Sequence, residues 1–455
     1  MFEVRNKDIT VIGLSKRTGV AVTKILCKKG ANVTLSDIKS KEELKKELDL
    51  LKDYNFKLDL GGHSEKSLQS ELIVVSPGVP LDLSFFQKAK KKKIPVISEI
   101  ELAYRFTKAN IIGITGTNGK TTTTSLTGKI LKNAEIENKV KIGGNIGIPL
   151  IEVATDLSAS DWVVAEISSF QLEAVKEFRP YIGAYLNFTP DHLDRHKNIE
   201  NYFNAKKNIF KNQTQRDYAV INLDDKQVKK SVIDCKAKIF GVSLNKIPKQ
   251  GAFIENNKIM IKIGDIVEEI IAISDIPLRG KHNIMNTAFA SLISRLVGVK
   301  PEIIKREIKK YELKKHRLQK LDIKSQYTVI DDSKATNPDA AIQALKSCKP
   351  PIILIAGGQD RNADFTEFAK MINQRVKTLI LMGETKNKLK ETVLKTGFKD
   401  IYVVDNMENA VKIAVNNLES EEVLLLSPGC PSWDMYSSYK KRGKEFQEEV
   451  KKRLK

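Results

Sequence analysis

Residues 111–122 read Ile-Ile-Gly-Ile-Thr-Gly-Thr-Asn-Gly-Lys-Thr-Thr, and this stretch decides the fold of the region around it. The apolar, β-branched run from Ile111 to Thr115 predicts a buried strand, and the residues after Lys120 predict the start of a helix. A Gly-rich turn between a strand and a helix binds anions, because unpaired N–H groups and the positive end of the helix dipole converge there. Lys120 adds a charge for the β- and γ-phosphates, and Thr121 adds a hydroxyl ligand for Mg²⁺. We therefore predict a nucleoside triphosphate site at Gly116, Thr117, Asn118, Gly119, Lys120, Thr121 and Thr122.

The match to the phosphate-loop pattern G-x-x-x-x-G-K-[ST] is incomplete. Ile114 stands at the first glycine position, and Gly113 and Gly116 flank the pattern instead. An ordinary glycine turn between a strand and a helix is the alternative interpretation. Lys120 and Thr121, directly after Asn-Gly and behind an apolar strand, favour the phosphate loop.

Length and composition indicate a soluble protein of several domains. A chain of 455 residues is too long for one core, so we expect two to three domains. No apolar run approaches the roughly 18 residues of a membrane span, and the first residues do not begin a signal peptide. The four cysteines are scattered, which is typical of reduced thiols in the cytosol. We expect a cytoplasmic protein with no membrane insertion.

The net charge of +21 admits more than one interpretation. A basic surface can follow a nucleic-acid backbone, or it can attract small anionic substrates. Most of the basic residues are lysines spread over predicted helices, which solvated helix faces explain about as well. The charge by itself therefore identifies no partner.

Residues 1–108 predict a Rossmann-like unit that begins with a βαβ motif. Residues 8–14 and 31–36 predict strands around a helix that extends to Lys29. Ser15 replaces the second glycine of G-x-G-x-x-G, which disfavours a dinucleotide, whereas a nucleotide diphosphate still fits the helix N-terminus. Asp37, at the end of the second strand, is placed for a ribose or a base. A rigid turn at the carboxyl edge of this sheet, where such folds bind ligands, contains Ser76, Pro77 and Gly78.

Residues 109–314 open with the phosphate loop and carry further polar groups at strand ends. Residues 161–165 predict a strand that ends at Glu166, where a carboxylate is a natural Mg²⁺ ligand; a solvated glutamate is the alternative. Residues 185–188 predict another strand, followed by His192 in a polar stretch that is either an ordinary loop or part of the nucleotide site. Asn283 and Asn286 lie on one face of a predicted helix, where they can bind adenine or ribose, although a helix N-cap also explains Asn283.

Residues 315–455 predict a second doubly wound α/β unit. Four apolar strands each end in small and polar residues, which places a ligand site at the carboxyl edge of a parallel sheet. The four predicted strands are residues 327–331, 352–356, 378–382 and 423–426. The whole chain is thus predicted to be an α/β protein of three domains, 1–108, 109–314 and 315–455.

Together these motifs resemble the Mur ligases of peptidoglycan synthesis, and among them the MurD type. The resemblance covers essentially the whole chain. Residues 166–172 and 191–195 are similar to the metal-site motifs of the family, and His282, Asn283, Asn286, His316 and Arg317 to its nucleotide contacts. Sister ligases and folylpolyglutamate synthetases share these elements, whereas residues 332–337 and 427–434 resemble the D-glutamate-adding member more specifically. The resemblance implies a UDP-binding, an ATP-binding and an amino-acid-binding domain.

The activity that the resemblance implies is ATP-dependent addition of D-glutamate to UDP-N-acetylmuramoyl-L-alanine through an acyl phosphate. Two Mg²⁺ ions would neutralise the anions that meet in the first step. Thr121 and Glu166 are the implied ligands of one ion. His192 and a CO₂-derived carbamate on Lys206 are those of the other, because a cationic lysine cannot bind Mg²⁺. The implied catalytic residues are Lys120, Glu166, His192, Lys206 and Lys334.

The resemblance also implies three sets of binding residues. Besides the phosphate loop, ATP would contact Asn283, Asn286, Arg317 and Asp332. The UDP-sugar would contact Gly13, Leu14, Ser15, Asp37, Ser76, Pro77 and Gly78, with Asn145 and Ser168 towards its reacting end. D-Glutamate would contact Thr336, Arg361, Ser432, Trp433 and Tyr439.

Two positions depart from the family. Arg361 stands where the D-glutamate-adding member carries a lysine, and an arginine can grip a carboxylate bidentately. The loop 13–19 is one residue longer than in that family.

Three alternatives stay open from the sequence alone. One is a sister ligase with another amino acid or a folate substrate, although the ATPase domain comes first in the folate ligases. The second is a basic P-loop protein acting on nucleic acid, and the third a nicotinamide-dependent oxidoreductase. Our prediction is the ligase, acting as a monomer and binding no nucleic acid.

Overall fold

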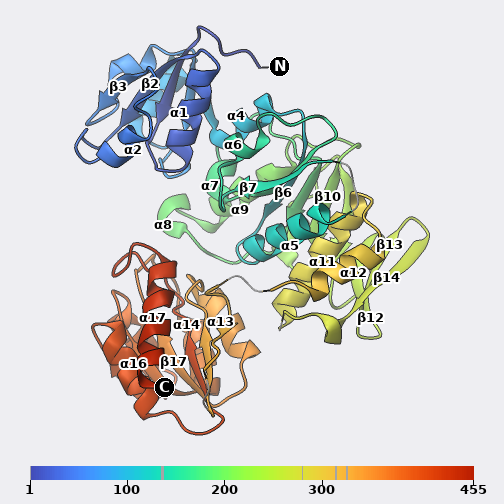
Figure 1. The fold of residues 1–455 in the computed structure, drawn as a ribbon, viewed down its shortest axis with the longest axis vertical. Coiled ribbons are helices and arrows are strands. Elements are labelled where there is room, and N and C mark those ends of the chain that lie inside the picture. Colours follow the sequence, from blue (N-terminus) through green and yellow to red (C-terminus); the bar gives the residue numbers. More distant parts are fainter. Residues whose placement is uncertain (1, 135–137, 279, 313–314, 324–325, 455) are drawn as a thin grey trace. The chain divides into compact units, whose positions relative to one another are not determined.

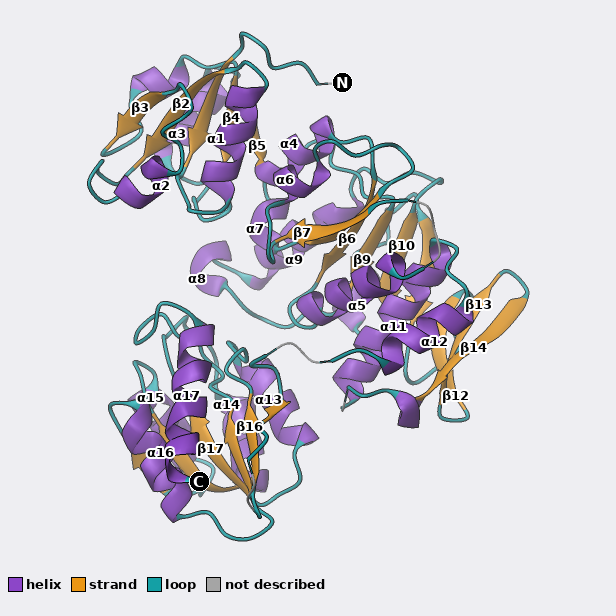
Figure 2. Ribbon diagram, in the orientation of Figure 1, coloured by secondary structure: helices purple, strands orange, loops and turns teal. Residues whose placement is uncertain are grey.

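The computed structural model describes residues 2–134, 138–278, 280–312, 315–323 and 326–454. Within these ranges the strands form three sheets, each with helices packed beside it (Figures 1 and 2). The residues group into two compact units. The first holds the chain up to Phe188, Asn198–Ile276 and Met285–Lys310, and the second holds Thr189–Lys197, Pro277–Ile284 and Tyr311–Lys455. The predicted domain boundary at 314 and 315 falls beside residues 313–314, which lie outside the described residues.

The N-terminal sheet is parallel, with strand order β3-β2-β1-β4-β5. The predicted βαβ motif is confirmed as β1, α1 and β2, and its strands run side by side from the Asp8–Asn32 pair onward. The residues predicted to bind the UDP moiety follow the carboxyl ends of β1, β2 and β4, where doubly wound sheets bind ligands. The elements are Asp8–Ile12 (β1), Thr18–Lys28 (α1), Asn32–Asp37 (β2), Lys45–Asp49 (α2), Lys57–Leu60 (β3), Glu65–Leu68 (η1), Leu72–Val75 (β4), Ser84–Lys91 (α3), Val96–Ser98 (β5) and Glu99–Phe106 (α4).

The central sheet has the order β14-β13-β12-β11-β10-β9-β6-β8-β7, and it places the predicted phosphate-loop strand β6 between β8 and β9. Its first elements are Asn110–Thr115 (β6), Lys120–Lys132 (α5), Val140–Gly144 (β7), Leu150–Ala154 (α6), Trp162–Glu166 (β8), Ser169–Leu172 (α7), Ile182–Tyr185 (β9), Leu193–His196 (α8), Ile199–Lys207 (α9) and Asn208–Phe210 (η2). They continue as Tyr218–Asn222 (β10), Lys226–Lys230 (α10), Lys238–Val242 (β11), Gly251–Glu255 (β12), Lys258–Ile263 (β13), Ile266–Ala272 (β14), Ile273–Asp275 (η3), Lys281–Leu296 (α11) and Pro301–Lys309 (α12).

Two features of the central sheet differ from the sequence-based expectation. The predicted strand at 185–188 is wrong in position, because the strand is Ile182–Tyr185 and residues 186–188 belong to the loop that follows it. The antiparallel strands β12, β13 and β14 were not foreseen. Charged residues interrupt the apolar ones in these strands, and Ile266 and Val267 are exposed on the edge strand β14, so the segment lacked the continuous apolar runs of the buried parallel strands.

The C-terminal sheet confirms the second doubly wound unit. Its order is β15-β16-β20-β17-β18-β19, and only the short strand β15 pairs antiparallel among the described residues. The elements are Gln319–Lys320 (β15), Thr328–Asp331 (β16), Pro338–Ser347 (α13), Ile352–Ala356 (β17), Thr366–Arg375 (α14), Val376–Leu381 (β18), Lys386–Leu394 (α15), Ile401–Val403 (β19), Met407–Asn416 (α16), Val423–Leu426 (β20) and Tyr439–Arg453 (α17).

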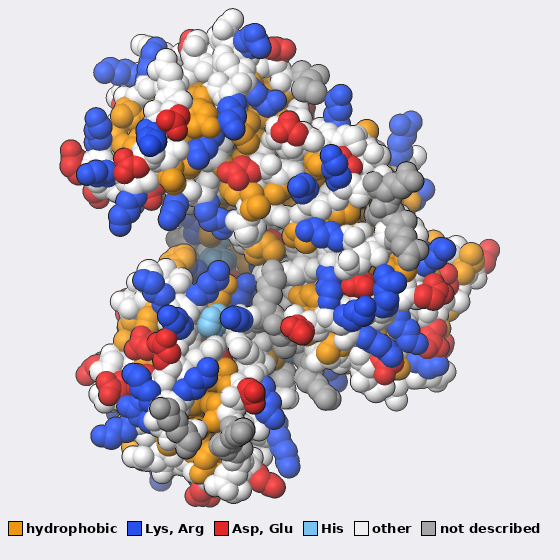
Figure 3. Space-filling view, viewed as in Figure 1, with side chains coloured by type: hydrophobic (Ala, Val, Ile, Leu, Met, Phe, Trp, Pro, Cys, Tyr) orange, Lys and Arg blue, Asp and Glu red, His pale blue; other side chains and the backbone are white. Residues whose placement is uncertain are grey.

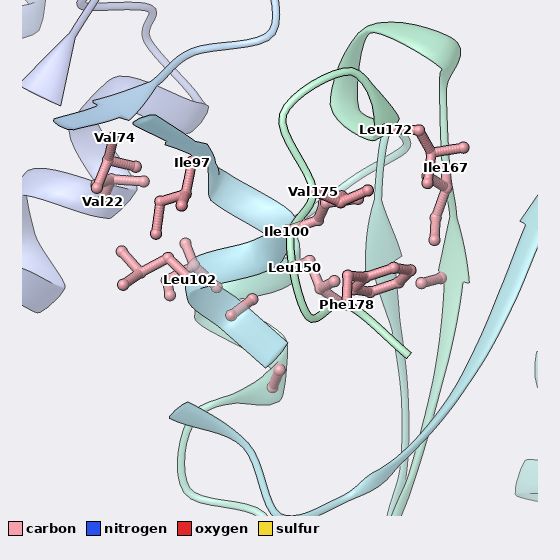
Figure 4. Close-up of a cluster of buried hydrophobic side chains, with 14 of the residues drawn as sticks. Val22, Val74, Ile97, Ile100, Leu102, Leu150, Ile167, Leu172, Val175 and Phe178 are labelled. Atoms are coloured by element: carbon pink, nitrogen blue, oxygen red, sulfur yellow. The ribbon is translucent and has the colours of Figure 1, made fainter. Parts of the chain in front are cut away.

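A continuous apolar core joins the N-terminal sheet to the central sheet. Val22 from α1, Val74 from β4, Ile100 and Leu102 from α4, and Phe178 from the central region belong to one buried cluster (Figure 4). Burial of such side chains stabilises a fold by roughly 1.5–3 kcal/mol each. Helix α4 therefore packs these two parts of the first unit together.

The buried carboxylate of Glu101 reinforces the same helix. Its oxygens accept hydrogen bonds from the backbone N–H groups of Lys176 (2.9 Å), Glu177 (3.0 Å) and Phe178 (2.8 Å). Arg105, one turn further along α4, donates to it from 2.9 Å. A fully buried carboxylate is tolerated because each oxygen is paired with donors.

The surface gives two further observations. No helix among the described residues is long and apolar enough to cross a membrane. On the face shown in Figure 3, Lys and Arg side chains are spread widely, with Asp and Glu among them. That distribution is typical of solvated helix faces rather than of one basic track.

We expect Glu101→Ala to lower the free energy of unfolding by about 3 kcal/mol, because several buried N–H groups lose their acceptor together. Chemical denaturation followed by circular dichroism measures the change. Glu177→Ala is the matched control, since this exposed glutamate pairs with the same Arg105 and should cost less than about 0.5 kcal/mol. Equal losses for the two variants would contradict the role of Glu101.

Candidate functional site

The predicted phosphate loop lies between β6 and α5, with Lys120 as the first residue of the helix. Gly119 adopts a left-handed conformation, with φ of 82°. A Cβ atom at this position would lie 2.2 Å from Oδ1 of Asn286, on helix α11. Only glycine therefore allows the loop to pack this closely against α11. Asn286, predicted from its spacing to contact nucleotide, is brought directly beside the loop.

Two lysine side chains converge on one carbonyl of this loop. Nζ of Lys120 donates to the carbonyl oxygens of Gly116 and Thr117, both at 2.7 Å. Nζ of Lys206, on α9, donates to the same Gly116 oxygen at 2.8 Å. Lys206 is only 1% exposed, and its Nζ lies 4.7 Å from the ring centre of Tyr202. The arrangement concentrates positive charge where the phosphates are predicted to bind.

Two residues that the sequence analysis did not single out fix the shape of the loop. Asn187 accepts a hydrogen bond from the backbone N–H of Asn118 (2.8 Å) and donates to its carbonyl (3.0 Å). The hydroxyls of Thr117 and Tyr202 lie 3.2 Å apart. The signal for Asn187 was available, because it follows a strand that neighbours β6 and carboxyl ends of adjacent parallel strands meet at one edge.

The carboxylate of Glu166 ends β8 at this same edge, and it is 2% exposed. Its Oε1 accepts a hydrogen bond from the side-chain amide of Asn145 at 2.9 Å. Its Oε2 is buried and has no hydrogen-bond partner among the described residues. Since a buried carboxylate oxygen without a partner is costly, this atom fits a ligand position for a divalent cation.

The residues predicted to bind the UDP moiety gather at the carboxyl edge of the N-terminal sheet. Both oxygens of Asp37 accept backbone N–H groups, from Leu14 (2.6 Å) and Lys39 (3.0 Å). The Ser76 hydroxyl donates to the carbonyl of Gly13 at 2.6 Å. Asp37 thus holds the loop after β1 in place, a positioning role that the sequence did not reveal. Ser15, Pro77 and Gly78 lie in the turns of this edge, and Ser168 caps helix α7.

In the second unit, His192 contacts a residue of the predicted amino-acid site. Nδ1 of His192 lies 3.2 Å from Nη1 of Arg361, and the Arg361 guanidinium stacks 4.8 Å from the ring centre of Trp433. Asp191, beside His192, accepts a hydrogen bond from Asn337 at 3.0 Å. The stretch 189–197, which follows a central strand in sequence, therefore groups with the C-terminal region.

The described residues contain no cluster of three or more His, Cys, Asp and Glu side chains arranged as metal ligands. Thr121, Glu166 and Lys206 belong to the first unit, and His192 belongs to the second. The predicted second metal site, His192 with carbamylated Lys206, therefore stays a prediction.

Two predicted nucleotide contacts of the second unit have shifted pKa values. Burial raises the pKa of Asp332 to about 7, against hydrogen bonds from the Leu318 N–H and the Ser427 hydroxyl. Burial, helped by the charge of Arg317, lowers the pKa of His282 to about 4, so this histidine is neutral at pH 7. Asn283 is the third residue of α11, so the alternative interpretation of this residue as a helix N-cap is wrong.

Of the remaining predicted amino-acid contacts, Thr336 and Ser432 follow β16 and β20, and Tyr439 is the first residue of α17. Nζ of Lys334 lies 5.3 Å from the ring centre of Tyr439. A buried arginine that the sequence analysis missed, Arg442, donates to the carbonyls of Ser333 (2.9 Å) and Cys430 (3.0 Å). It connects the loop carrying Thr336 with the loop carrying Ser432. Its only sequence signal was a basic residue on an apolar helix face.

Comparison with known proteins decides the family. Models of the Mur ligase MurD-like N-terminal domain, the Mur ligase middle domain and the Mur ligase glutamate ligase domain match residues 7–98, 114–294 and 316–430. The chain belongs to the Mur ligase family. The resemblance noted from the sequence is thereby confirmed, and so is the three-domain α/β architecture of this Mur ligase.

Curated relatives match this Mur ligase over its full length. The UDP-N-acetylmuramoylalanine–D-glutamate ligase of Alkaliphilus oremlandii is 43% identical over 98% of both chains. The ligase of the same name from Clostridioides difficile is 42% identical over 98% of this chain and 99% of its own length.

Solved structures share the fold at lower identity. MurC of Thermotoga maritima aligns with 98% of this chain and 100% of its own at a TM-score of 0.59 and 19% identity. MurF of Acinetobacter baumannii aligns with 99% of this chain and 92% of its own at a TM-score of 0.63 and 14% identity.

We expect Gly119→Ala to weaken binding of Mg-ATP at least a hundredfold, because the added Cβ collides with Asn286 and strains a left-handed residue. Isothermal titration calorimetry measures the affinity. Gly264→Ala is the matched control, since Gly264 also has a positive φ (63°) but no atom within 4 Å of the added Cβ. Unchanged affinity in Gly119→Ala would contradict the assignment of the loop.

Proposed function

We propose that this Mur ligase joins D-glutamate to UDP-N-acetylmuramoyl-L-alanine at the expense of ATP, in the cytoplasmic synthesis of peptidoglycan precursors. One observation carries the proposal. A phosphate loop with two convergent lysines lies in the same unit as an Asn145–Glu166 pair, in a chain whose whole length matches relatives named for this reaction. The protein works as a monomer, with its substrates as its partners.

In the first step the alanyl carboxylate oxygen attacks the γ-phosphorus of ATP. A bond forms between these atoms, the bond to the β–γ bridging oxygen breaks, and ADP leaves with that electron pair. Because both reactants are anions, the step depends on neutralising charge. Lys120 neutralises charge at the phosphates, a role that its hydrogen bonds to the carbonyls of the loop support. Asn145 orients the carboxylate end of the UDP-sugar.

Mg²⁺ fits the residues present. Thr121 and Glu166 would hold one ion, for which the unpartnered Oε2 of Glu166 is an appropriate ligand. His192 and a carbamate on Lys206 would hold a second. When bound, Mg²⁺ supplies positive charge that stabilises the transferring phosphoryl group. Two ammonium groups, those of Lys120 and Lys206, share the Gly116 carbonyl. A carbamate on Lys206 would turn one of these two cations into an anion.

In the second step the amine of D-glutamate attacks the acyl phosphate. A C–N bond forms, the amine loses a proton, and phosphate leaves from the tetrahedral intermediate. Arg361 binds the side-chain carboxylate of D-glutamate, with its guanidinium oriented by stacking on Trp433. Thr336, Ser432 and Tyr439 complete the pocket, and Lys334 contacts the transferred phosphate. ATP is further held by Asn283, Asn286, Arg317 and Asp332.

Phosphate release from Mg-ATP tests the proposed function directly. The enzyme is supplied with UDP-N-acetylmuramoyl-L-alanine and, separately, with D-glutamate, L-glutamate, L-lysine or diaminopimelate. We expect turnover with D-glutamate only, because Arg361 matches a second carboxylate on the amino acid. Turnover with another amino acid would keep the mechanism and overturn the specificity. No turnover with any of them, together with stimulation by DNA or RNA, would favour the nucleic-acid alternative.

We expect Lys206→Ala to lower kcat at least a hundredfold, with partial recovery in formate or acetate, which refill an anionic ligand position. Recovery in methylamine but not in the carboxylates would show that the ammonium group is what matters, and would contradict the carbamate. Lys207→Ala is the matched control, since the neighbouring Lys207 pairs with Asp234 on the surface and should leave kcat within about twofold.

A further inference from the structure

The turn that carries Asn145 is held tightly against the end of β8. Gly144 has a φ of 98°, and a Cβ there would lie 2.4 Å from the Glu166 carbonyl oxygen. The Asn145 backbone N–H donates to that oxygen at 2.7 Å, and its side chain reaches Oε1 of Glu166. The Gly144 N–H closes the turn onto the Ile148 carbonyl at 2.8 Å. These contacts use the N–H groups of Gly144 and Asn145. The carbonyl oxygens of the same two residues accept hydrogen bonds from another segment.

Arg17, which follows strand β1 of the N-terminal sheet, donates hydrogen bonds to those two carbonyls. Its Nη2 donates to the Gly144 oxygen at 3.1 Å, and its Nη1 donates to the Asn145 oxygen at 3.3 Å. Arg17 lies in the loop between β1 and α1, directly after the residues proposed to bind the UDP moiety. One planar guanidinium therefore joins the carboxyl edges of two different sheets.

The loop that carries Arg17 is held in place by hydrogen bonds within the N-terminal region, so the position of Arg17 is fixed. The Ser15 hydroxyl accepts the backbone N–H groups of Thr18 (3.1 Å) and Gly19 (3.2 Å). The Leu14 N–H is held by Asp37. Arg17 also lies near Glu99, on α4: burial raises the pKa of Glu99 to about 7, and the charge of Arg17 opposes that rise.

We propose that Arg17 is a positioning residue that sets the distance between the UDP-binding loop and the Asn145 turn, and so selects a UDP-sugar whose carboxylate reaches Asn145. The inference rests on the proposed function. In that reaction the nucleotide end of the substrate lies at Gly13 to Ser15, and the alanyl carboxylate lies at Asn145. Arg17 contacts the protein at both places, and it acts through the turn rather than on the reacting atoms. The loop between β1 and α1 supplies it.

The test compares Arg17→Ala with Lys16→Ala, which removes the same charge from the neighbouring exposed residue. We expect Arg17→Ala to raise KM for UDP-N-acetylmuramoyl-L-alanine about tenfold or more and to lower kcat, because two charge-assisted hydrogen bonds to the turn are lost. KM for D-glutamate should stay unchanged. Arg17→Lys keeps the charge but not the paired donors, so it should recover only part of the loss. Lys16→Ala should stay within about twofold of the wild type.

Direct binding separates positioning from simple attraction of the diphosphate. By calorimetry, Arg17→Ala should bind UDP alone as tightly as the wild type, and bind UDP-N-acetylmuramoyl-L-alanine more weakly. Equal weakening for both ligands, or equal effects of Arg17→Ala and Lys16→Ala, would overturn the inference. So would an unchanged KM in Arg17→Ala. If the wild-type enzyme itself shows no turnover with D-glutamate, the proposed function fails instead, and that outcome is visible before any variant is measured.

Discussion

The carbonyl oxygen of Gly116 accepts hydrogen bonds from two lysine side chains, and the geometry of the proposed nucleotide site depends on it. Two ammonium groups repel each other at short range, so their convergence requires an acceptor between them or an anion beside them. Helix α9 brings Lys206 to this point in a nearly fully buried position. The loop 116–119 is fixed around this carbonyl by contacts with Asn187, Tyr202 and helix α11, which approaches closely at Gly119. A site that gathers this much positive charge is suited to a triphosphate.

Buried carboxylates in the first unit differ in how their oxygens are paired. Glu101 and Asp37 have both oxygens engaged by donors of the chain, so they fix segments relative to each other. Glu166 has one oxygen engaged by Asn145 and one buried oxygen without a partner among the described residues. Glu99, whose Oε1 accepts the Ile151 N–H, also has a buried Oε2 without a partner among the described residues. What distinguishes Glu166 as the proposed Mg²⁺ ligand is its place at the end of β8, beside the strand β6 that leads into the predicted phosphate loop.

The second unit shows how one side chain can serve two sites. Arg361 stacks on Trp433 and contacts His192, so the residue proposed to recognise the amino acid touches the residue proposed to bind metal. Arginine suits this position better than lysine, because its planar group can stack and hydrogen-bond at the same time. The departure from the family at this position is thus consistent with the same function. Arg442 joins the loops that carry Ser333 and Cys430 by donating hydrogen bonds to both carbonyls.

The sequence by itself determined the parallel sheets, the strand, turn and helix of the predicted phosphate loop, and the family, because these depend on local patterns: apolar β-branched strands, glycines at tight turns and polar residues directly after strands. It also indicated Glu166 and the Asn283–Asn286 pair, since each lies at a predictable place on a strand or a helix. Only the tertiary structure decided that Lys120 and Lys206 share a carbonyl, that Asp37 orders a loop, and that Arg17 spans two sheets. These contacts join residues far apart in the chain, Arg17 and Asn145 among them, and no local pattern encodes a distance between two sheets.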